Sequence, residues 1–312
     1  MDHDPVTHDA TDRELGRFPS GRDVSVTVHR YEGGPGPTAF VQAAQHGIEL
    51  NGPAALRRLH ARLVDAEIAG TVIAVPVANP IAFDNRSYLT PESYDAFNSN
   101  FNRIWPGDED GSFQERLAAN LWPLVETADA AVDLHTGMPE MLEHVRFGAD
   151  DDDARALAEA FGTEFLLADT DTDAGGGDDF AGKFRVAAAA TGVPAITAEL
   201  SNSRTVQRPA VEAGVEGVWN VLRELGVVAE PAAPTAERRL LHDDAPRVIA
   251  GASGLFELRA DLGVGDEVAE GESLGGVFDP SSFERLETIT ASADGVIYSA
   301  ARGGVVVTGE RV

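Results

Sequence analysis

A histidine and a glutamate stand three positions apart directly after a short apolar run. Residues 39–44 are mostly apolar, and the polar turn that follows them carries His46 and Glu49. An imidazole nitrogen and a carboxylate oxygen can bind the same cation when a turn presents both on one side. A zinc site that catalyses hydrolysis also needs a third protein ligand and one position left for water. The first question is therefore which residue could complete such a site.

His135 is the candidate for the third ligand. It follows an apolar strand predicted over residues 130–134, and Asp133 stands two positions before it. Two residues at this spacing on a strand point the same way, so the Asp133 carboxylate could orient the imidazole of His135. Each pattern is common by chance when taken alone. The other histidines are expected to be structural or to lie in a frayed N-terminus: His3, His8, His29, His60, His144 and His242.

A carboxylate also stands at the end of an apolar strand predicted over residues 195–200. Burial raises the pKa of a carboxyl group, which suits Glu199 to general base work near neutral pH. A buried glutamate without a role would be costly. Glu199 is therefore a candidate catalytic residue.

Two arginines and a group of amides occupy a long stretch between the candidate ligands, within residues 79–86 and 98–107. The planar guanidinium of arginine binds carboxylates through two parallel hydrogen bonds. Salt bridges on an acidic surface explain any single arginine here equally well. The stretch is nevertheless longer and more polar than a simple connection requires.

The elements that would position these residues alternate between strand and helix. Strands are expected over residues 23–31, 38–44, 71–77, 130–134, 164–167 and 195–200, and helices over 53–68, 113–126, 153–161, 180–190 and 210–225. Such alternation predicts a largely parallel or mixed sheet that is covered by helices on both faces. In such sheets ligands bind at the carboxyl ends of strands, where His46, Asn79, His135 and Glu199 all fall.

The last quarter of the chain lacks a helical period. After a proline- and alanine-rich linker over residues 229–237, short β runs alternate with glycine turns. We therefore expect a catalytic domain over residues 21–230 and a small C-terminal all-β domain over 238–312, which would cap the site. The β domain is of the biotinyl type in outline, but it has no lysine and cannot be a lipoyl or biotinyl carrier. Residues 1–20 are expected to be frayed.

Composition excludes several functions. The formal net charge is −28, from 52 acidic and 24 basic residues, and Lys183 is the only lysine. This balance argues against nucleic acid and against anionic membranes, because both require basic surfaces. It is typical of proteins that work at molar salt, where surface repulsion is screened. There is no cysteine, no apolar stretch long enough for a membrane helix and no secretory pattern, so a soluble cytoplasmic protein is expected. Homo-oligomerisation is left open.

Five motifs occur in a recognisable order over residues 37–225. They are His-Gly-x-Glu, Asn-Pro-x-Ala-Phe with a following arginine, Asn-x-Asn-Arg-x-x-Pro-Gly, Asp-Leu-His-Thr and Pro-Ala-Ile-Thr-x-Glu. This order resembles the succinylglutamate desuccinylase/aspartoacylase family, a branch of the zinc carboxypeptidase fold. The resemblance implies an α/β fold with a zinc carboxypeptidase-like mixed sheet, helices on both faces and a small C-terminal all-β domain.

The resemblance also implies roles for individual residues. His46, Glu49 and His135 would hold one Zn²⁺ per chain, and Glu199 would be the general base and acid for the attacking water. Arg86 would polarise the scissile carbonyl. Asn102 and Arg103 would grip the free carboxylate of a small-molecule substrate, and Asn79 would line the site. Tyr298 could reach the site from the C-terminal domain, although a packed core tyrosine is the alternative.

The implied reaction is hydrolysis of the amide bond of an N-acyl amino acid or a related small carboxylate. An esterase or carboxypeptidase on the same zinc site and a non-catalytic metal- or ligand-binding relative are the alternatives. The chain departs from the family at Ile48, where many relatives are polar, and after Glu199, where Leu200 replaces a common glycine. It also lacks the arginine that the aspartate-cleaving branch places ahead of the glutamate strand; Lys183 and Arg185 are the nearest basic residues. This last departure weakens the expectation of an N-acyl aspartate substrate.

Overall fold

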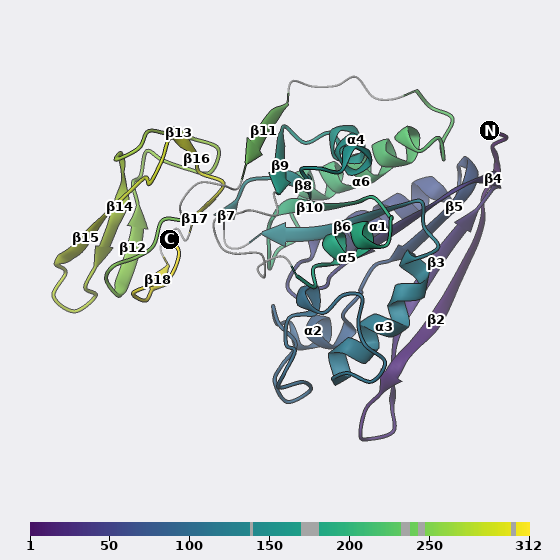
Figure 1. Cartoon of the computed structure of the whole chain (residues 1–312), viewed down its shortest axis with the longest axis horizontal. Coiled ribbons are helices and arrows are strands. Elements are labelled where there is room, and N and C mark those ends of the chain that lie inside the picture. Colours follow the sequence, from purple (N-terminus) through teal and green to yellow (C-terminus); the bar gives the residue numbers. More distant parts are fainter. Residues whose placement is uncertain (138–139, 170–180, 232–237, 243–246, 301–303) are drawn as a thin grey trace.

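The computed structural model describes residues 1–137, 140–169, 181–231, 238–242, 247–300 and 304–312. A large mixed sheet lies between helices, and smaller β-sheets lie to one side of it (Figure 1). Strands follow the order β11-β9-β8-β10-β6-β4-β5-β3-β2 in the large sheet, and β1 pairs with β5. Their bounds are β1 Asp4–Pro5, β2 Thr7–Arg17, β3 Asp23–Glu32, β4 Gly34–Ala43, β5 Glu67–Val75, β6 Ala130–Gly137, β8 His144–Gly148, β9 Phe165–Asp169, β10 Ala195–Asn202 and β11 Arg239–His242.

The centre of the sheet is parallel. β4 pairs with both β5 and β6, and β6 pairs with β10, all in parallel. The next strand, β8, is antiparallel to β10 and was not predicted. β8 follows the short strand β7 (Glu140–Met141). The five residues of β8 include His144 and Arg146, so the sequence has no long apolar run here that would predict a strand. Its position matters because it places His144 directly opposite Glu199.

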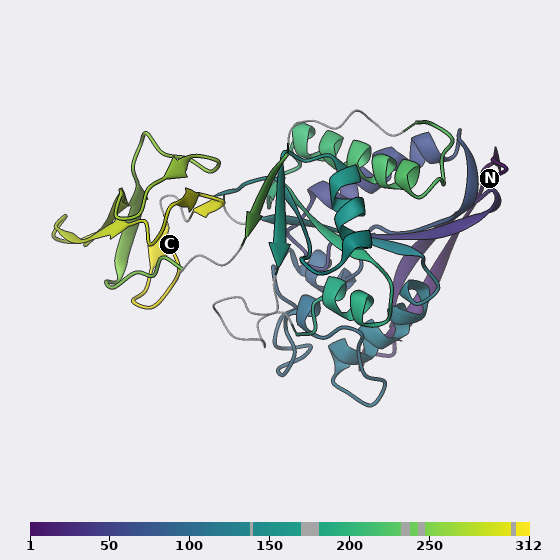
Figure 2. The ribbon, with the colours of Figure 1, turned by 45° about the horizontal axis from the view of Figure 1, so that its top comes forward.

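Helices cover both faces of the sheet, as the alternation of elements predicted (Figure 2). Side chains of successive residues on a strand point to opposite faces. Val41 accordingly enters the core beneath one layer of helices, and Phe40 enters the core beneath the other. The first layer contains α1 (Asn51–Leu63), α4 (Asp152–Phe161) and α6 (Arg208–Glu224); the second contains α2 (Pro80–Asn85), the 3-10 turn Phe101–Arg103, α3 (Phe113–Val125) and α5 (Phe184–Ala190).

Local sequence explains where several helices begin and end. Ser112 and Glu115 form a reciprocal capping box that starts α3. Asp151 caps the first turn of α4, which ends at Gly162 with a φ of 100°. A left-handed residue at that position is a common helix terminator, and glycine adopts it without strain.

The N-terminal segment is ordered, so the expectation that residues 1–20 are frayed was wrong. β2 pairs with β3 along the edge of the large sheet, from Thr7 opposite Glu32 to Arg17 opposite Asp23. Most side chains of β2 are exposed, and Leu15 is its one buried residue. An edge strand whose side chains face water has a polar composition, which resembles that of a disordered tail.

The C-terminal sheets form a separate core around Phe256, Val277 and Ile289. Four strands pair in the order β15-β14-β12-β18, and β13 pairs with β16. The bounds are β12 Gly254–Leu258, β13 Glu267–Val268, β14 Ser273–Phe278, β15 Arg285–Thr290, β16 Gly295–Val296, β17 Ser299–Ala300 and β18 Val305–Val306. Residues 239–242, which the sequence assigned to this part, instead form β11 at the edge of the large sheet.

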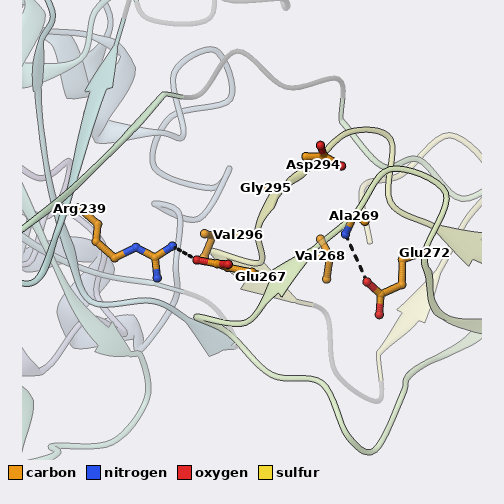
Figure 3. A pocket seen from close by; sticks show the side chains of 8 residues that line it. All are labelled: Arg239, Glu267, Val268, Ala269, Glu272, Asp294, Gly295 and Val296. Carbon is orange, nitrogen blue, oxygen red and sulfur yellow. Dashed lines mark hydrogen bonds and ion pairs between the residues drawn. The ribbon is translucent and has the colours of Figure 1, made fainter.

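Strand pairing and an ion pair help to connect the C-terminal sheets with the rest of the described chain. β17 pairs with β7, which follows the strand of His135. Arg239 of β11 donates a hydrogen bond of 2.6 Å to Glu267 in a pocket that is otherwise lined by β13, β16 and neighbouring residues (Figure 3). None of the residues lining this pocket is a candidate site residue. Among the described residues, no helix is long and apolar enough to cross a membrane.

Candidate metal centre

The three predicted ligands converge. One ligand atom from each of His46, Glu49 and His135 lies within 4.8 Å of those of the other two. All three side chains are buried, each with 3% of its surface exposed. The sequence separates His135 from the other two by more than eighty positions, and the parallel pairing of β4 with β6 brings them together.

The turn after β4 presents His46 and Glu49 on the same side. It begins at Ala44, which has a φ of 53°, and the Glu49 amide donates a hydrogen bond of 3.1 Å to the His46 carbonyl. Between the two, Gly47 lies directly against α2. A Cβ at this position would stand 2.0 Å from the carbonyl oxygen of Ala82, so no other residue fits without moving the backbone.

A buried hydrogen-bond network orients His135. Its Nε2 lies 2.8 Å from Asp133 Oδ2, as the strand spacing predicted. Asp133 also accepts hydrogen bonds from Gln42 and Gln45, at 3.2 and 2.7 Å. The Trp105 indole donates to the other end of the Gln45 amide at 2.7 Å, which fixes the orientation of that amide. If the neutral imidazole of His135 donates Nε2–H to Asp133, its Nδ1 lone pair faces Glu49.

The donor atoms fit a bound cation better than they fit one another. His135 Nδ1 and Glu49 Oε2 lie 3.0 Å apart, yet Oε2 accepts no hydrogen bond of normal geometry. Such a short distance without a hydrogen bond is expected when the lone pairs of both atoms are directed at the same metal ion. On the opposite side, His46 Nδ1 lies 3.2 Å from the Tyr88 carbonyl, which leaves Nε2 for a metal. Two imidazoles and a carboxylate are a donor set that suits Zn²⁺.

The surroundings of His46 favour its neutral form, which is the form that binds a metal. Burial, together with the neighbouring His135, lowers the pKa of His46 to about 3, so its imidazole is neutral. Burial disfavours the charged form of His135, but Asp133 and Glu49 outweigh this effect and raise its pKa. Burial raises the pKa of Glu49. A cation at this site would favour the deprotonated forms of both Glu49 and His135.

Glu199 lies beside the cluster. It pairs in register with His135 across β10 and β6 and with His144 across β10 and β8. Burial raises its pKa above the ordinary value, as expected from the sequence. Its side chain is nevertheless only half-buried, whereas Glu49 is buried, so water can reach it. The two glutamates therefore differ in access, which suits one to binding and the other to proton transfer.

The predicted substrate-binding residues differ in placement. Asn102 is buried beside His135: its Nδ2 lies 3.3 Å from His135 Nε2, and its Oδ1 accepts a hydrogen bond of 2.8 Å from the Phe184 amide. Arg103 is exposed, and its charge helps to lower the pKa of His46, so it lies near the cluster. Arg86 is exposed at the end of α2, and among the described residues no hydrogen bond or ion pair links it to the cluster. Their roles toward substrate remain predictions.

Comparison with known proteins gives the evolutionary context of this arrangement. The model of the succinylglutamate desuccinylase/aspartoacylase catalytic domain matches residues 35–225. The N-alpha-acetyl-L-2,4-diaminobutyric acid deacetylase of Halomonas elongata is 31% identical over 268 residues, which is 82% of this chain and 75% of the relative. The chain belongs to the succinylglutamate desuccinylase/aspartoacylase family.

Solved structures of the family share the whole fold. A succinylglutamate desuccinylase/aspartoacylase from Rhodobacter sphaeroides has a TM-score of 0.83 and 27% identity, covering 100% of this chain and 94% of the other. The product-bound ectoine utilization protein EutE (DoeB) from Ruegeria pomeroyi has a TM-score of 0.84 and 26% identity, covering 100% and 95%. The family resemblance and the expected fold, C-terminal sheets included, are thereby confirmed. The names of these relatives are those of a deacetylase and of a desuccinylase/aspartoacylase.

Asn79 was predicted to line the site of this family member, but its side chain is committed to the fold. It is 1% exposed. Its Oδ1 accepts a hydrogen bond of 3.1 Å from the Ala82 amide and so caps α2, while its Nδ2 donates to the Gln45 carbonyl and to Thr90 Oγ1 at 3.1 and 3.0 Å. The asparagine before a proline at the first helical position is a helix-start signature. Asn79 thus connects α2 to the turn after β4 that carries His46 and Glu49.

Replacing Asn79 with alanine should therefore destabilise the protein by about 3 kcal/mol, because it removes a cap and leaves buried polar groups unpaired. Denaturant unfolding of the two chains would measure this loss. Asp84→Ala, at an exposed position of the same helix, should change stability by no more than about 0.5 kcal/mol. A variant Asn79→Ala that unfolds like the wild type and only raises KM would instead place Asn79 on the substrate.

Sequence reasoning missed Tyr88. Its ring stacks on that of His46, with centroids 4.0 Å apart and an angle of 24° between the planes. Burial and the charges of Glu49 and Glu199 raise the pKa of Tyr88 to about 12, so the phenol keeps its proton. The influence of both glutamates shows that the side chain lies near the three candidate ligands and near the candidate base. Its signal in the sequence was weak, because a single tyrosine in a polar loop has many explanations.

Tyr298 also lies near the site. Its ring is edge-on to His144, with centroids 6.2 Å apart, and its carbonyl accepts a hydrogen bond of 2.7 Å from the Leu142 amide. His144 is the cross-strand neighbour of Glu199. The C-terminal sheets thus contribute one aromatic side chain next to the neighbour of the candidate base.

The two basic residues near α5 have different surroundings. Arg185 is buried and forms an ion pair with Asp169, which also receives a hydrogen bond of 2.9 Å from Arg146. Lys183 is only partly buried. Burial and the nearby guanidinium groups, led by that of Arg146, lower its pKa to about 7. Arg185 is therefore satisfied within the protein, whereas the amine of Lys183 loses its proton near neutral pH.

Glu143 gives the protein a pH-dependent stability. Burial raises its pKa from 4.5 to about 7, so between these values the folded chain binds more protons than the unfolded chain. Stability must then fall as the pH rises through this window, by up to about 3 kcal/mol. Glu143→Gln should abolish this slope, which leaves the variant more stable than the wild type at pH 8 and similar at pH 5. Denaturant midpoints at both pH values would test this, with the exposed Glu92→Gln as the control.

Proposed function

We propose that the protein is a zinc-dependent deacylase that hydrolyses the amide bond of a small N-acyl amino acid. The observation that carries the proposal is the convergence of His46, Glu49 and His135, with Glu199 in register beside the last of them. A site for binding alone would not need a second, more accessible carboxyl group with a raised pKa.

Each residue of the cluster has a distinct task. His46, Glu49 and His135 would hold the zinc ion, which when bound supplies a Lewis acid and lowers the pKa of water. Glu199 takes a proton from the attacking water and delivers it to the leaving amine. Its raised pKa serves both steps, because a group that accepts and returns a proton works best near the working pH. Tyr88, which stacks on His46, keeps its own proton and can donate a hydrogen bond.

Positive charge beside the site would select the substrate. Arg103 lies at the rim, and the one described lysine follows Gly182, whose carbonyl accepts a hydrogen bond from the Trp105 amide at 3.0 Å. A guanidinium group binds a carboxylate by charge-assisted hydrogen bonds. Arg86 would polarise the scissile carbonyl after a movement of the exposed end of α2. In a chain of net charge −28, the guanidinium groups of Arg103 and Arg86 favour an anionic group of the substrate.

The C-terminal sheets would restrict the substrate to small molecules. Their pairing of β17 with β7 places them next to the strand that carries His135. A narrow entrance disfavours peptides but admits both amides and esters of small acids.

A substrate screen at molar salt tests the proposal. N-acetyl, N-succinyl and N-formyl amino acids should be compared, beginning with N-acetyl-2,4-diaminobutyrate because a relative at 31% identity deacetylates it. We expect zinc-dependent release of the amine from at least one N-acyl amino acid, with no cleavage of dipeptides. The matching esters, run in parallel, separate a deacylase from an esterase. Protein that holds zinc yet hydrolyses none of these compounds would contradict the proposal.

A further inference from the structure

A second group of histidines meets outside the candidate active site. His8 on β2, His29 on β3 and His60 on α1 each offer a ring nitrogen within 4.8 Å of the other two. Three of the eight histidines of the chain thus gather at one point from three separate elements. We propose that His8, His29 and His60 form a second metal site, which takes a borderline divalent cation such as Zn²⁺ and is positioned by Tyr31.

Strand pairing and helix packing build this cluster. His8 lies opposite Tyr31 across β2 and β3, and His29 lies two positions from Tyr31 on the same strand, so all three side chains share one face of the sheet. Tyr31 belongs to the core beneath α1, the helix that carries His60 in its last turn. The cluster therefore joins the edge of the sheet to its helical layer.

The spacing of the nitrogens fits a shared cation. His8 Nε2 and His29 Nδ1 lie 3.1 Å apart. Two nitrogens that bind one tetrahedral zinc at about 2.0–2.1 Å stand roughly 3.3–3.4 Å from each other, so little movement is needed. Imidazole is a preferred ligand of zinc, copper and nickel. His8 is exposed and the other two rings are half-buried, which leaves an open path for the ion and a free position for water.

Tyr31 supplies the orientation that metal-binding histidines usually receive from a neighbour. Its hydroxyl lies 2.8 Å from His60 Nδ1, so Nδ1–H can donate to the phenol oxygen, which would leave the Nε2 lone pair for a metal. Burial raises the pKa of Tyr31 to about 12, so it acts as a neutral partner and not as a phenolate ligand. Burial and the two neighbouring histidines lower the pKa of His29, which keeps its lone pair available at neutral pH.

Ring stacking alone is the competing explanation. The His8 ring stacks on Tyr31 at 4.7 Å between centroids and meets His60 edge-on at 4.8 Å. Stacking accounts for the contact of the ring faces, but it does not require that one nitrogen of each imidazole lies within 4.8 Å of the other two. The two explanations differ in one measurable property, which is the number of metal ions that the chain binds.

Titration of the full, chelator-stripped chain with ZnCl₂ by calorimetry distinguishes them. The wild type should bind two zinc ions. His8→Ala and His29→Ala should each bind one, and His46→Ala should also bind one because it loses the other site. Tyr31→Phe should still bind two ions, but its affinity for one of them should fall by about 10–100-fold. His242→Ala, at an exposed histidine of β11, should retain two.

A stability measurement guards against misfolded variants. In the His46→Ala chain, zinc should raise the unfolding temperature, because the cluster ties β2 to β3 and α1 in the folded state only. The same addition should have no effect in the chain that carries both His46→Ala and His8→Ala, and His8 is exposed enough to be replaced without loss of packing. The proposal is overturned if the wild type binds a single zinc, or if His8→Ala and His29→Ala both retain two.

Discussion

Glu199→Gln should lower kcat by about a thousandfold while zinc stays bound, the range expected when a general acid–base residue is removed. Glutamine keeps the size of the side chain and its place between His135 and His144 in the sheet. It cannot accept a proton from water or return one to the leaving amine. The chemical step should therefore fail while the binding of metal and substrate changes little.

Two controls make this result specific. Glu143 is another partly buried residue whose carboxyl group has a raised pKa, and it directly precedes β8. Glu143→Gln should leave kcat unchanged. Metal analysis of Glu199→Gln should match the wild type, because this residue is not among the three ligands. A Glu199→Gln enzyme with full activity, measured on the best substrate of the screen, would show that another group transfers the proton.

His135→Ala should remove one zinc ion per chain and abolish hydrolysis. The Nδ1 of this histidine lies 3.0 Å from Glu49 Oε2 and its side chain is 3% exposed, so alanine removes one of the three candidate ligand atoms. His46→Ala should behave in the same way. Asp133→Asn is the informative intermediate: it keeps the ligands but weakens the acceptor for His135 Nε2–H, and should reduce zinc affinity by about 10–100-fold.

Metal analysis and circular dichroism separate the outcomes. All three variants should remain folded, because Asp133 and His135 lie on β6 and His46 closely follows β4, in a sheet with an extensive core on both faces. If His46→Ala and His135→Ala both retain the zinc content of the wild type, the metal does not bind between these residues. A variant that keeps zinc but loses activity would assign its histidine to catalysis.

The predictable part of the site is the part that strands carry. His135 and Glu199 follow apolar runs whose β-branched residues mark buried strands, and parallel strands end at a common edge. Residues on loops were harder, because their placement depends on packing that no local pattern encodes. Tyr88 was missed for this reason. Asn79 was predicted to line the site, and its position before Pro80 also signals the helix cap that the structure shows.

The edges of the sheet were the other source of error. β2 has a polar sequence because most of its side chains are exposed, and the four residues of β11 pair with β9, a strand that is distant in the sequence. A composition that is compatible with solvent therefore indicates either a tail or an edge strand. His8 was dismissed with the tail, and its meeting with His60 became visible only when β2 was placed beside β3.

The single lysine provides one defined position for chemical labelling. Lys183 is the N-cap of α5, adjacent to Phe184, whose amide holds the Asn102 side chain. With a pKa of about 7, its amine is nucleophilic at mildly alkaline pH. An amine-reactive dye would therefore label one side chain in the whole molecule, besides the N-terminal amine, and that side chain stands next to the site. Fluorescence from such a label would report when a ligand enters, without any mutation to create the attachment point.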